Sequence, residues 1–358
     1  MTWRMWRSGS AIGAVMLVLP GVATGQPRGL PTEARVAQLP AKAGPQQSEG
    51  WVPPRTADGQ PDLQGVWLSN SATPLERPQA LEGKSRLTDD EVAELQRRAD
   101  RLFKGGASDF AAGDGIFQAA WTNPAQYKNP NATHSSQDMV DMVFDNRTSL
   151  IVDPPNGRIP TLTPEAQASQ TETTAAGRLP AGPEHINNAL RCISWSVPRL
   201  GGRYGAGDLA FYQILQAPGY VVLYMETGHE ARIIPTDGRP ELSPHIRLWN
   251  GDSRGHWEGN TLVVETKNFA PTSNFMGAAE QLHVIERFTR VAPDMIHYEM
   301  TLTDPTTWTR PWKAMMPLRQ RSDRLFEFAC HEGNFHIMSG MLAGARVQEE
   351  AEAASVGR

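Results

Sequence analysis

Several features that mark other classes of protein are missing or scarce in this chain of 358 residues. It has no run of basic residues, and its 34 Lys and Arg stand against 39 Asp and Glu, so the charge footprint of a nucleic-acid-binding protein is absent. Its 20% of charged and 39% of hydrophobic residues exclude a wholly disordered chain and a protein with many membrane spans. We find no nucleotide, flavin or haem motif, so we expect no cofactor.

Long apolar runs are also missing. The run at residues 11–19 is about half as long as a bilayer crossing requires. It follows Arg4 and Arg7 and precedes the small residues of 22–25, which is the layout of a secretory signal peptide that is cleaved before Gln26. We therefore expect an exported protein, periplasmic or secreted, that has no membrane span once residues 1–25 are removed.

Cysteine is nearly absent, since only Cys192 and Cys330 occur. In an oxidising compartment such a pair more often forms a disulfide than stays reduced, and we predict this bridge. It would close a loop of more than a hundred residues and stabilise the fold by about 4 kcal/mol. The alternative is two separately buried thiols. Two cysteines this far apart do not form a zinc motif, and we predict no metal site.

Glycine and proline are abundant, with 32 and 28 residues, which predicts many turns and few long helices. Residues 26–60 are rich in Pro and Gln without a hydrophobic period, so we expect a flexible leader. Residues 61–205 should form a covering region that begins with a strand near Trp67. Its capping box of Thr88 and Glu91 predicts a helix that ends near residue 104, and a short helix should follow Thr163. The pattern of residues 107–207 is broken and predicts no regular fold.

From about residue 206 to 346 the hydrophobic period changes to two, which is typical of half-buried antiparallel strands. Ile296, Tyr298, Met300 and Leu302 alternate with polar residues, and the alternation recurs as far as 326–330. No segment of helix length separates these strands. We predict a mainly β protein, an antiparallel lipocalin-like barrel or a strongly curled sheet with an irregular, partly helical N-terminal half. Residues 347–358 should form a disordered tail.

Several segments resemble a family of exported bacterial proteins of uncharacterised function. The resemblance lies in Pro-Asp-Leu-Gln-Gly-Val-Trp at 61–67, Thr-Pro-Leu-Glu-Arg-Pro at 73–78, and the later segments 257–266 and 330–334. Together with shorter matches these span most of residues 61–346. The resemblance implies export and no established activity.

A second resemblance concerns shape. Gly65-Val66-Trp67 is similar to the Gly-x-Trp on the first strand of lipocalin-like barrels. The resemblance implies that Arg346, near the end of the strand-rich region, packs on Trp67. It also implies that the roughly 140 residues between Trp67 and the strand-rich region cover or plug the sheet.

Counting alternate positions places three carboxylates on the apolar side of neighbouring strands, namely Glu286, Asp304 and Glu332. Burying such groups unpaired costs several kcal/mol, so they must hold protons, cations or each other. Arg232 has the same parity as Tyr224 in one long strand over 220–234 and could be their partner. The pattern fits an acid/base pair in an apolar pocket. It fits a structural salt-bridge network equally well.

Histidine and serine offer weaker signals. His229 and His331 are candidates for general bases, and a metal would require them to converge with each other or with His283. Ser253 lies in a Gly-x-Ser-x-Gly motif, but a strand follows it where a hydrolase would have a helix. A loop between strands is therefore the better interpretation of that motif.

Aromatic residues could line a cavity. We predict that the ligand-binding side chains are those of Arg232, Tyr224, Trp257, Trp308 and Trp312. Aromatic residues in strands more often belong to the plain core, which is the alternative interpretation.

The leading hypothesis is that the barrel binds a small, partly apolar molecule in an internal cavity and transforms it by hydrolysis, elimination or isomerisation. The candidate catalytic residues are Glu286, Asp304, Glu332, His229 and His331. A non-catalytic carrier or scavenger is one alternative, and a surface module that binds a protein or a polysaccharide is another. The partner in the first two cases is a small molecule and not a nucleic acid. The sequence does not indicate the oligomeric state.

Overall fold

The computed structural model describes residues 51–69, 71–103, 121, 143–199, 211–322 and 324–356. The predicted signal peptide and residues 26–50 of the predicted leader lie outside these ranges. All described residues belong to the second of two units into which contacts divide the chain, residues 41–358. Within them, no helix is both long and apolar enough to cross a membrane.

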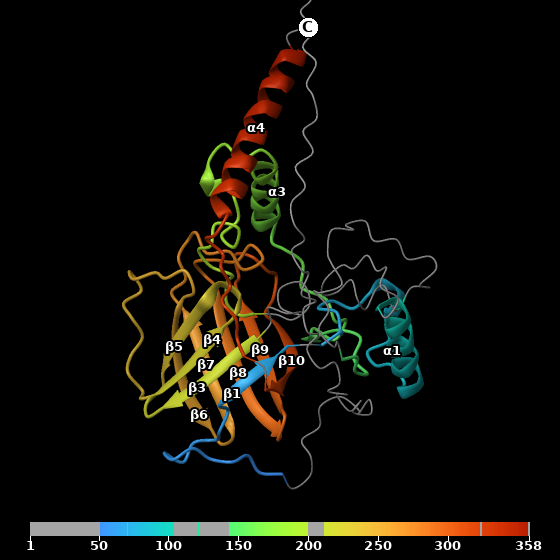
Figure 1. Cartoon of the computed structure of the whole chain (residues 1–358), viewed down its shortest axis with the longest axis vertical. Helices are drawn as coiled ribbons and strands as arrows, with labels where there is room; N and C mark the ends of the chain where they lie inside the picture. The colour runs from blue at the N-terminus through green and yellow to red at the C-terminus, as the bar shows by residue number, and fades with distance from the viewer. Residues whose placement is uncertain are drawn as a thin grey trace, which may run out of the picture. The chain divides into compact units, whose positions relative to one another are not determined.

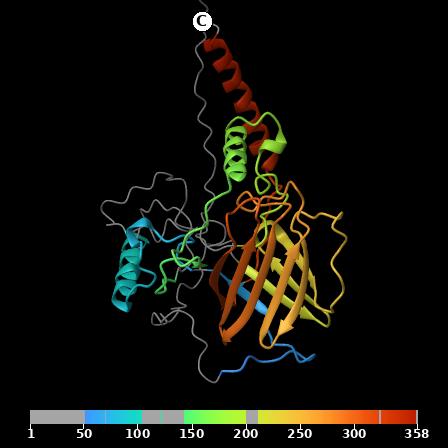
Figure 2. The same cartoon turned by 180° about the vertical axis from the view of Figure 1, so that it is seen from behind.

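One antiparallel sheet of ten strands dominates these residues (Figure 1). Its hydrogen-bonded order is β5-β4-β3-β1-β10-β9-β8-β7-β6, and β2 pairs with β10 off this path. The strands are β1 (Gly65–Leu68), β2 (Ile151–Asp153), β3 (Phe211–Ala217), β4 (Tyr220–Met225), β5 (Glu230–Pro235), β6 (Asp252–Glu258), β7 (Thr261–Lys267), β8 (His283–Ala292), β9 (Met295–Thr303) and β10 (Trp312–Arg321). Strands β6–β10, orange to red, form a continuous curved wall (Figure 2). The predicted strand at Trp67 is β1, which pairs with β3 and β10.

The alternation of the sequence becomes the two faces of this sheet. In β9 the buried side chains are those of Ile296, Tyr298, Met300 and Leu302, and the residues between them are partly exposed. Strand β8 repeats the pattern. Inward side chains of the strands join in one hydrophobic core, in which Trp67, Phe288 and Trp312 are fully buried. The mainly β prediction is therefore confirmed.

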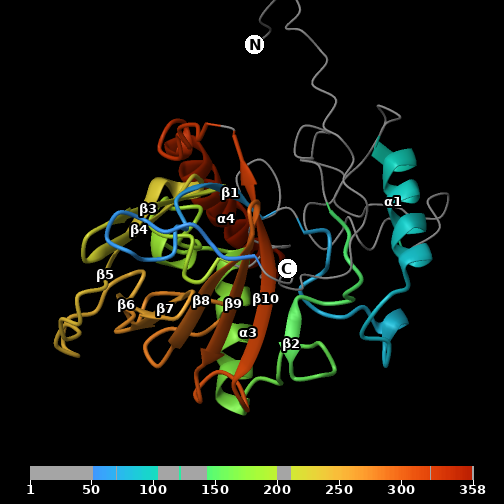
Figure 3. The same ribbon diagram turned by 90° about the horizontal axis from the view of Figure 1, so that it is seen from below.

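The sheet closes almost completely on itself, because β5 and β6 at the two ends of the strand order lie side by side (Figure 3). No backbone ladder joins these two strands in the part of the chain that the structure describes. Gly255 on β6 allows the close approach, since a Cβ atom there would lie 2.9 Å from Cγ2 of Thr236 and 3.0 Å from Cγ2 of Ile234. The fold is thus a nearly closed antiparallel barrel with one seam between β5 and β6.

Trp67 is held inside the barrel by two contacts. Its Nε1 donates a hydrogen bond to the carbonyl oxygen of Leu63 at 2.9 Å, and the guanidinium of Arg290 lies 5.3 Å from its ring centroid. The expectation that Arg346 packs on Trp67 is wrong. Arg346 belongs to an exposed turn of the last helix, whereas Arg290 projects inward from β8.

The helices carry a smaller part of the structure. The predicted capping box is present at α1 (Asp89–Phe103), where the amide of Thr88 donates to Glu91 and the amide of Glu91 donates to Thr88. The helix predicted after Thr163 is α3 (Pro164–Arg178), which buries no residue. Helix α1 contributes Val92, Leu95 and Ala99 to a second, smaller hydrophobic cluster. The described residues also contain the short 3-10 helices η1 (Gln79–Leu81), η3 (Pro183–His185) and η5 (Thr227–His229).

The C-terminal part differs from the prediction. Residues 324–330 form no strand, and helix α4 spans Asn334–Val356, where we expected no helix and, from residue 347, a disordered tail. The alternation over 326–330 is short enough to arise by chance. The Ala and Glu residues of α4 favour a helix, but they form no apolar stripe from which a helix could be predicted. The predicted disulfide is present: Cys192 and Cys330 are bonded, with Cα atoms 5.8 Å apart.

Candidate functional site

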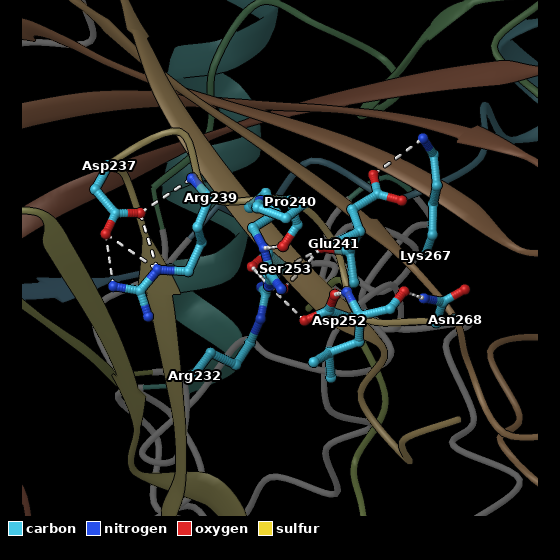
Figure 4. A network of polar contacts seen from close by, with 12 residues as sticks. Arg232, Asp237, Arg239, Pro240, Glu241, Asp252, Ser253, Lys267 and Asn268 are labelled. Carbon is cyan, nitrogen blue, oxygen red and sulfur yellow. Dashed lines mark hydrogen bonds and ion pairs between the residues drawn. The ribbon is translucent and has the colours of Figure 1, made fainter. Parts of the chain in front are cut away.

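A buried ion pair lies inside the barrel beside the seam. Nη1 of Arg232 on β5 donates to Oε1 of Glu286 on β8 at 3.0 Å, and Nη2 donates to Oε2 at 2.6 Å. Nη2 also donates to Oγ of Ser253 on β6 at 3.1 Å (Figure 4). It donates as well to Oγ1 of Thr266 on β7 at 3.1 Å. Because Arg232 contacts three strands on the far side of the seam, its side chain ties together the two ends of the sheet that no ladder joins.

Tyr298 on β9 completes this interior network. Its hydroxyl donates to Oε1 of Glu286 at 2.5 Å, and its ring stacks on Phe288 with centroids 4.4 Å apart. Burial raises the pKa of Tyr298 well above its usual value, and the charge of Glu286 raises it further, so the phenol stays protonated. Burial alone would lower the pKa of Arg232, but the attraction of Glu286 outweighs it and the pKa is raised. Arg232 therefore keeps its positive charge inside the barrel.

The predicted pairing of Arg232 with an inward carboxylate is present, but the strand assignment that led to Arg232 is wrong. The predicted long strand over 220–234 is two strands, because Gly228 and His229 turn the chain with φ angles of 76° and 51°. The turn reverses the parity, so Arg232 faces inward while Tyr224 faces outward. Glu286 faces inward as predicted, with an exposed fraction of 0%.

The other two carboxylates are not part of this network. Asp304 is buried as predicted, but its Oδ1 accepts hydrogen bonds from the amides of Thr306 and Thr307 and so fixes the turn after β9. Glu332 lies on an exposed turn before α4, so its predicted place on an inward strand face is wrong. In the described ranges, Glu286, Asp304 and Glu332 share no hydrogen-bond partner.

The two candidate histidines lie in different surroundings. His229 sits in the turn between β4 and β5, where its Nε2 accepts a hydrogen bond from the amide of Phe328 at 2.6 Å. The same Nε2 lies 3.3 Å from the carbonyl oxygen of Phe326. The ring of His229 also lies 6.0 Å from that of Tyr224. His331 lies in an exposed bend before α4.

Tyr224 and His229 line an open pocket of about 500 Å³ on the outer face of the barrel. Strands β1, β3 and β4 form its floor, and the extended segment 324–327 forms its wall. The amide of Phe326 donates to Oε1 of Glu226 at 2.7 Å and, with the Phe328–His229 bond, fixes this wall to the β4–β5 turn. The lining residues are Val66, Gln213, Tyr224, His229, Arg324, Leu325, Phe326 and Glu327.

The remaining candidates from the sequence do not line this pocket. Trp308 and Trp312 lie in the core, with ring centroids 5.5 Å apart, and Trp257 is half-buried against it. Their positions agree with the plain-core interpretation. Ser253 lies in strand β6, not in a loop, and its hydroxyl is engaged by Arg232 and Thr266.

A second buried ion pair was not predicted from the sequence. Nη2 of Arg199 donates to Oε2 of Glu230 at 2.7 Å, and the other oxygen of Glu230 accepts from the amide of Trp195. Burial lowers the pKa of Arg199, and Glu230 offsets part of that effect. Arg199 and Trp195 fall in the region whose pattern predicted no fold, so no signal in the sequence pointed to this pair. The pair anchors the segment that carries Cys192 to the β4–β5 turn.

Fold and site together define a nearly closed antiparallel barrel with charged residues paired inside and a pocket on its outer face. No protein-family model matches this chain, and no curated protein matches it at a significant level.

Proposed function

We propose that this protein is an exported barrel that binds a small, partly apolar molecule in the pocket of Tyr224, His229 and Phe326. The observation that carries the proposal is the pocket itself. Its volume of about 500 Å³ falls within the range of roughly 300–1,000 Å³ that is typical of small-molecule sites. The signal-peptide layout and the resemblance to an exported family support export of the protein, and the disulfide is compatible with export.

The lining suits a ligand with an apolar body and a few polar atoms. Val66, Tyr224 and Phe326 offer apolar and aromatic surface, while Gln213 and Arg324 offer hydrogen-bond donors. The side chain of Phe326 is 75% exposed, which is unfavourable for a large aromatic ring in water. A ligand that covers this ring would recover part of that free energy.

Binding on the outer face is favoured over catalysis in the interior. Glu286 is fully buried and uses both carboxylate oxygens on Arg232, so it offers no free atom to a substrate. Nε2 of His229 is engaged by Phe328. The carrier function that the sequence allowed therefore takes precedence over acid/base turnover, which requires a catalytic group free to reach the substrate.

Titration with anilinonaphthalene sulfonate (ANS), an aromatic and partly apolar fluorophore, tests the proposal. The wild-type protein should bind one equivalent with increased fluorescence. Tyr224→Ala and Phe326→Ala should each weaken binding at least about tenfold, because each removes an aromatic wall of the pocket. Phe335→Ala is the matched control, since Phe335 is also 75% exposed but does not line the pocket.

Circular dichroism and the melting temperature of each variant show whether it folds. If ANS does not bind to the folded wild type, or if Phe335→Ala weakens binding as much as Phe326→Ala does, the pocket is not the binding site. A chemical change of a molecule that copurifies with the protein would instead favour the enzymatic alternative.

A further inference from the structure

The outer face of β3–β5 is apolar beyond the pocket. Strand register places Leu215, Val222 and Ile233 in one row across the three strands. All three point outward, and Leu215 and Ile233 are 45% and 64% exposed. We call these three residues the apolar row.

Such a row is unusual on a solvated sheet face, which is ordinarily polar. The outer face on the other side of the same barrel shows the ordinary pattern. There Arg287 on β8 pairs with Glu299 on β9, and Thr301 on β9 pairs with Lys313 on β10. Since one barrel has both kinds of face, the apolar row is a local feature, and exposed apolar patches of this kind mark binding surfaces.

The apolar row is continuous with the pocket. Gln213 and Tyr224, which line the pocket, form the adjacent outward row of the same strands. Adjacent outward residues lie about 7 Å apart along a strand. A ligand that fills the pocket and extends along the strands by that distance therefore meets Leu215 and Val222 next.

The row ends at a charged boundary. The next outward row contains Tyr220, whose ring is covered by the guanidinium of Arg239 at 4.9 Å. Nη2 of Arg239 donates to the hydroxyl of Tyr220 at 2.6 Å, and Arg239 is paired with Asp237 (Figure 4). The apolar surface is thus a short strip between the pocket and this ion pair.

We infer that the ligand carries a linear hydrocarbon chain, which lies along the apolar row while its polar end occupies the pocket beside Arg324. The inference rests on the proposed function and deepens it. A linear chain fits a strip one row wide, which a bulky ring system or a protein surface does not. One side of the chain remains in water, so each added methylene should tighten binding about twofold, against about fourfold for full burial.

Displacement of ANS by hexanoate, octanoate, decanoate and dodecanoate, each below its micellar concentration, tests this inference. The wild type should bind the longer carboxylates progressively more tightly. Leu215→Ser and Ile233→Ser should flatten this dependence and leave the affinities for ANS and hexanoate unchanged, because both residues lie outside the pocket. Ile285→Ser is the control, since Ile285 points outward on the opposite face.

The outcomes separate the two proposals. If ANS binds and responds to Tyr224→Ala, but chain length has no effect, the inference fails while the proposed function stands. The same holds if Ile285→Ser flattens the dependence as strongly as Ile233→Ser does. If ANS itself does not bind, the proposed function fails. If Ile233→Ser changes the oligomeric state measured by light scattering, the row is a protein interface and the inference is wrong.

Discussion

Arg232 on β5 and Glu286 on β8 form a two-point ion pair in the barrel interior, with exposed fractions of 8% and 0%. The pair reaches across the seam between β5 and β6, where the described strands share no backbone ladder. The role of the pair is structural, because it holds together the two ends of the sheet on whose outer face the pocket lies.

Glu286→Gln should therefore destabilise the protein strongly. The substitution leaves the charge of Arg232 buried without a counter-charge, which costs about 3–5 kcal/mol. The double variant Arg232→Met with Glu286→Leu should lose less, since no isolated charge remains. Urea unfolding measures both free energies. A single variant that stays within about 1 kcal/mol of the wild type would contradict this role.

Gly255→Ala should weaken the seam. The added methyl group would lie 2.9 Å from Cγ2 of Thr236, and the strands would have to move apart. We expect a loss of about 1–3 kcal/mol in the free energy of unfolding. Gly340→Ala is the control, because nothing lies within 4 Å of a Cβ atom at that helical position. It should leave stability unchanged or raise it slightly. Equal effects of the two substitutions would show that the seam is not tightly packed.

Acid should destabilise the fold through His297. Burial, with a smaller contribution from Arg147, lowers the pKa of His297 to about 4 from 6.5. As the pH falls, His297 is protonated near pH 6.5 in the unfolded chain but only near pH 4 in the folded protein. The free energy of unfolding therefore decreases as the pH falls across this window. Because His297 is partly exposed, we expect a contribution of about 1 kcal/mol.

His297→Gln removes this proton uptake and should flatten the pH dependence of the urea midpoint between about pH 7.5 and pH 5. His331→Gln is the control, because His331 is exposed and should leave the dependence as it is in the wild type. If the His297→Gln variant retains the full pH dependence of the urea midpoint, groups other than His297 cause that dependence.

Reduction should destabilise the protein through one bond. Cys192 and Cys330 are the chain's two cysteines, so any effect of a reductant on the melting curve belongs to their disulfide. The bond spans 138 residues, and the chain-entropy model gives a loss of about 4–5 kcal/mol when it is opened. The Cys192→Ala/Cys330→Ala variant should melt at a lower temperature than the wild type, and reductant should not change its melting temperature. If reductant leaves the wild-type curve unchanged, this loop closure does not stabilise the fold.

The fold could be predicted from the sequence where one simple period governs a long segment. Strands β8 and β9 alternate without interruption over nine or ten residues, so the inward position of Glu286 followed from counting. Prediction failed where the period was short or broken. Residues 326–330 gave too few alternations to distinguish a strand from an irregular segment, and Glu332 was misplaced with them. The turn at Gly228 and His229 interrupted a run that looked continuous.

The pocket was beyond prediction for a different reason. Tyr224 and His229 are candidates from the sequence, but Phe326 joins them through the bonds of the amides of Phe326 and Phe328 to Glu226 and His229, about 100 residues earlier in the chain. No local pattern encodes such a contact. The same applies to Arg199 and Glu230, which meet through packing of an irregular segment.

The most direct test of the central claim is a crystal structure of the protein with bound ANS. Electron density for one molecule should lie between the rings of Tyr224 and Phe326, on the outer face of the barrel. Density inside the barrel beside Glu286, or at a surface site away from both rings, would contradict the claim.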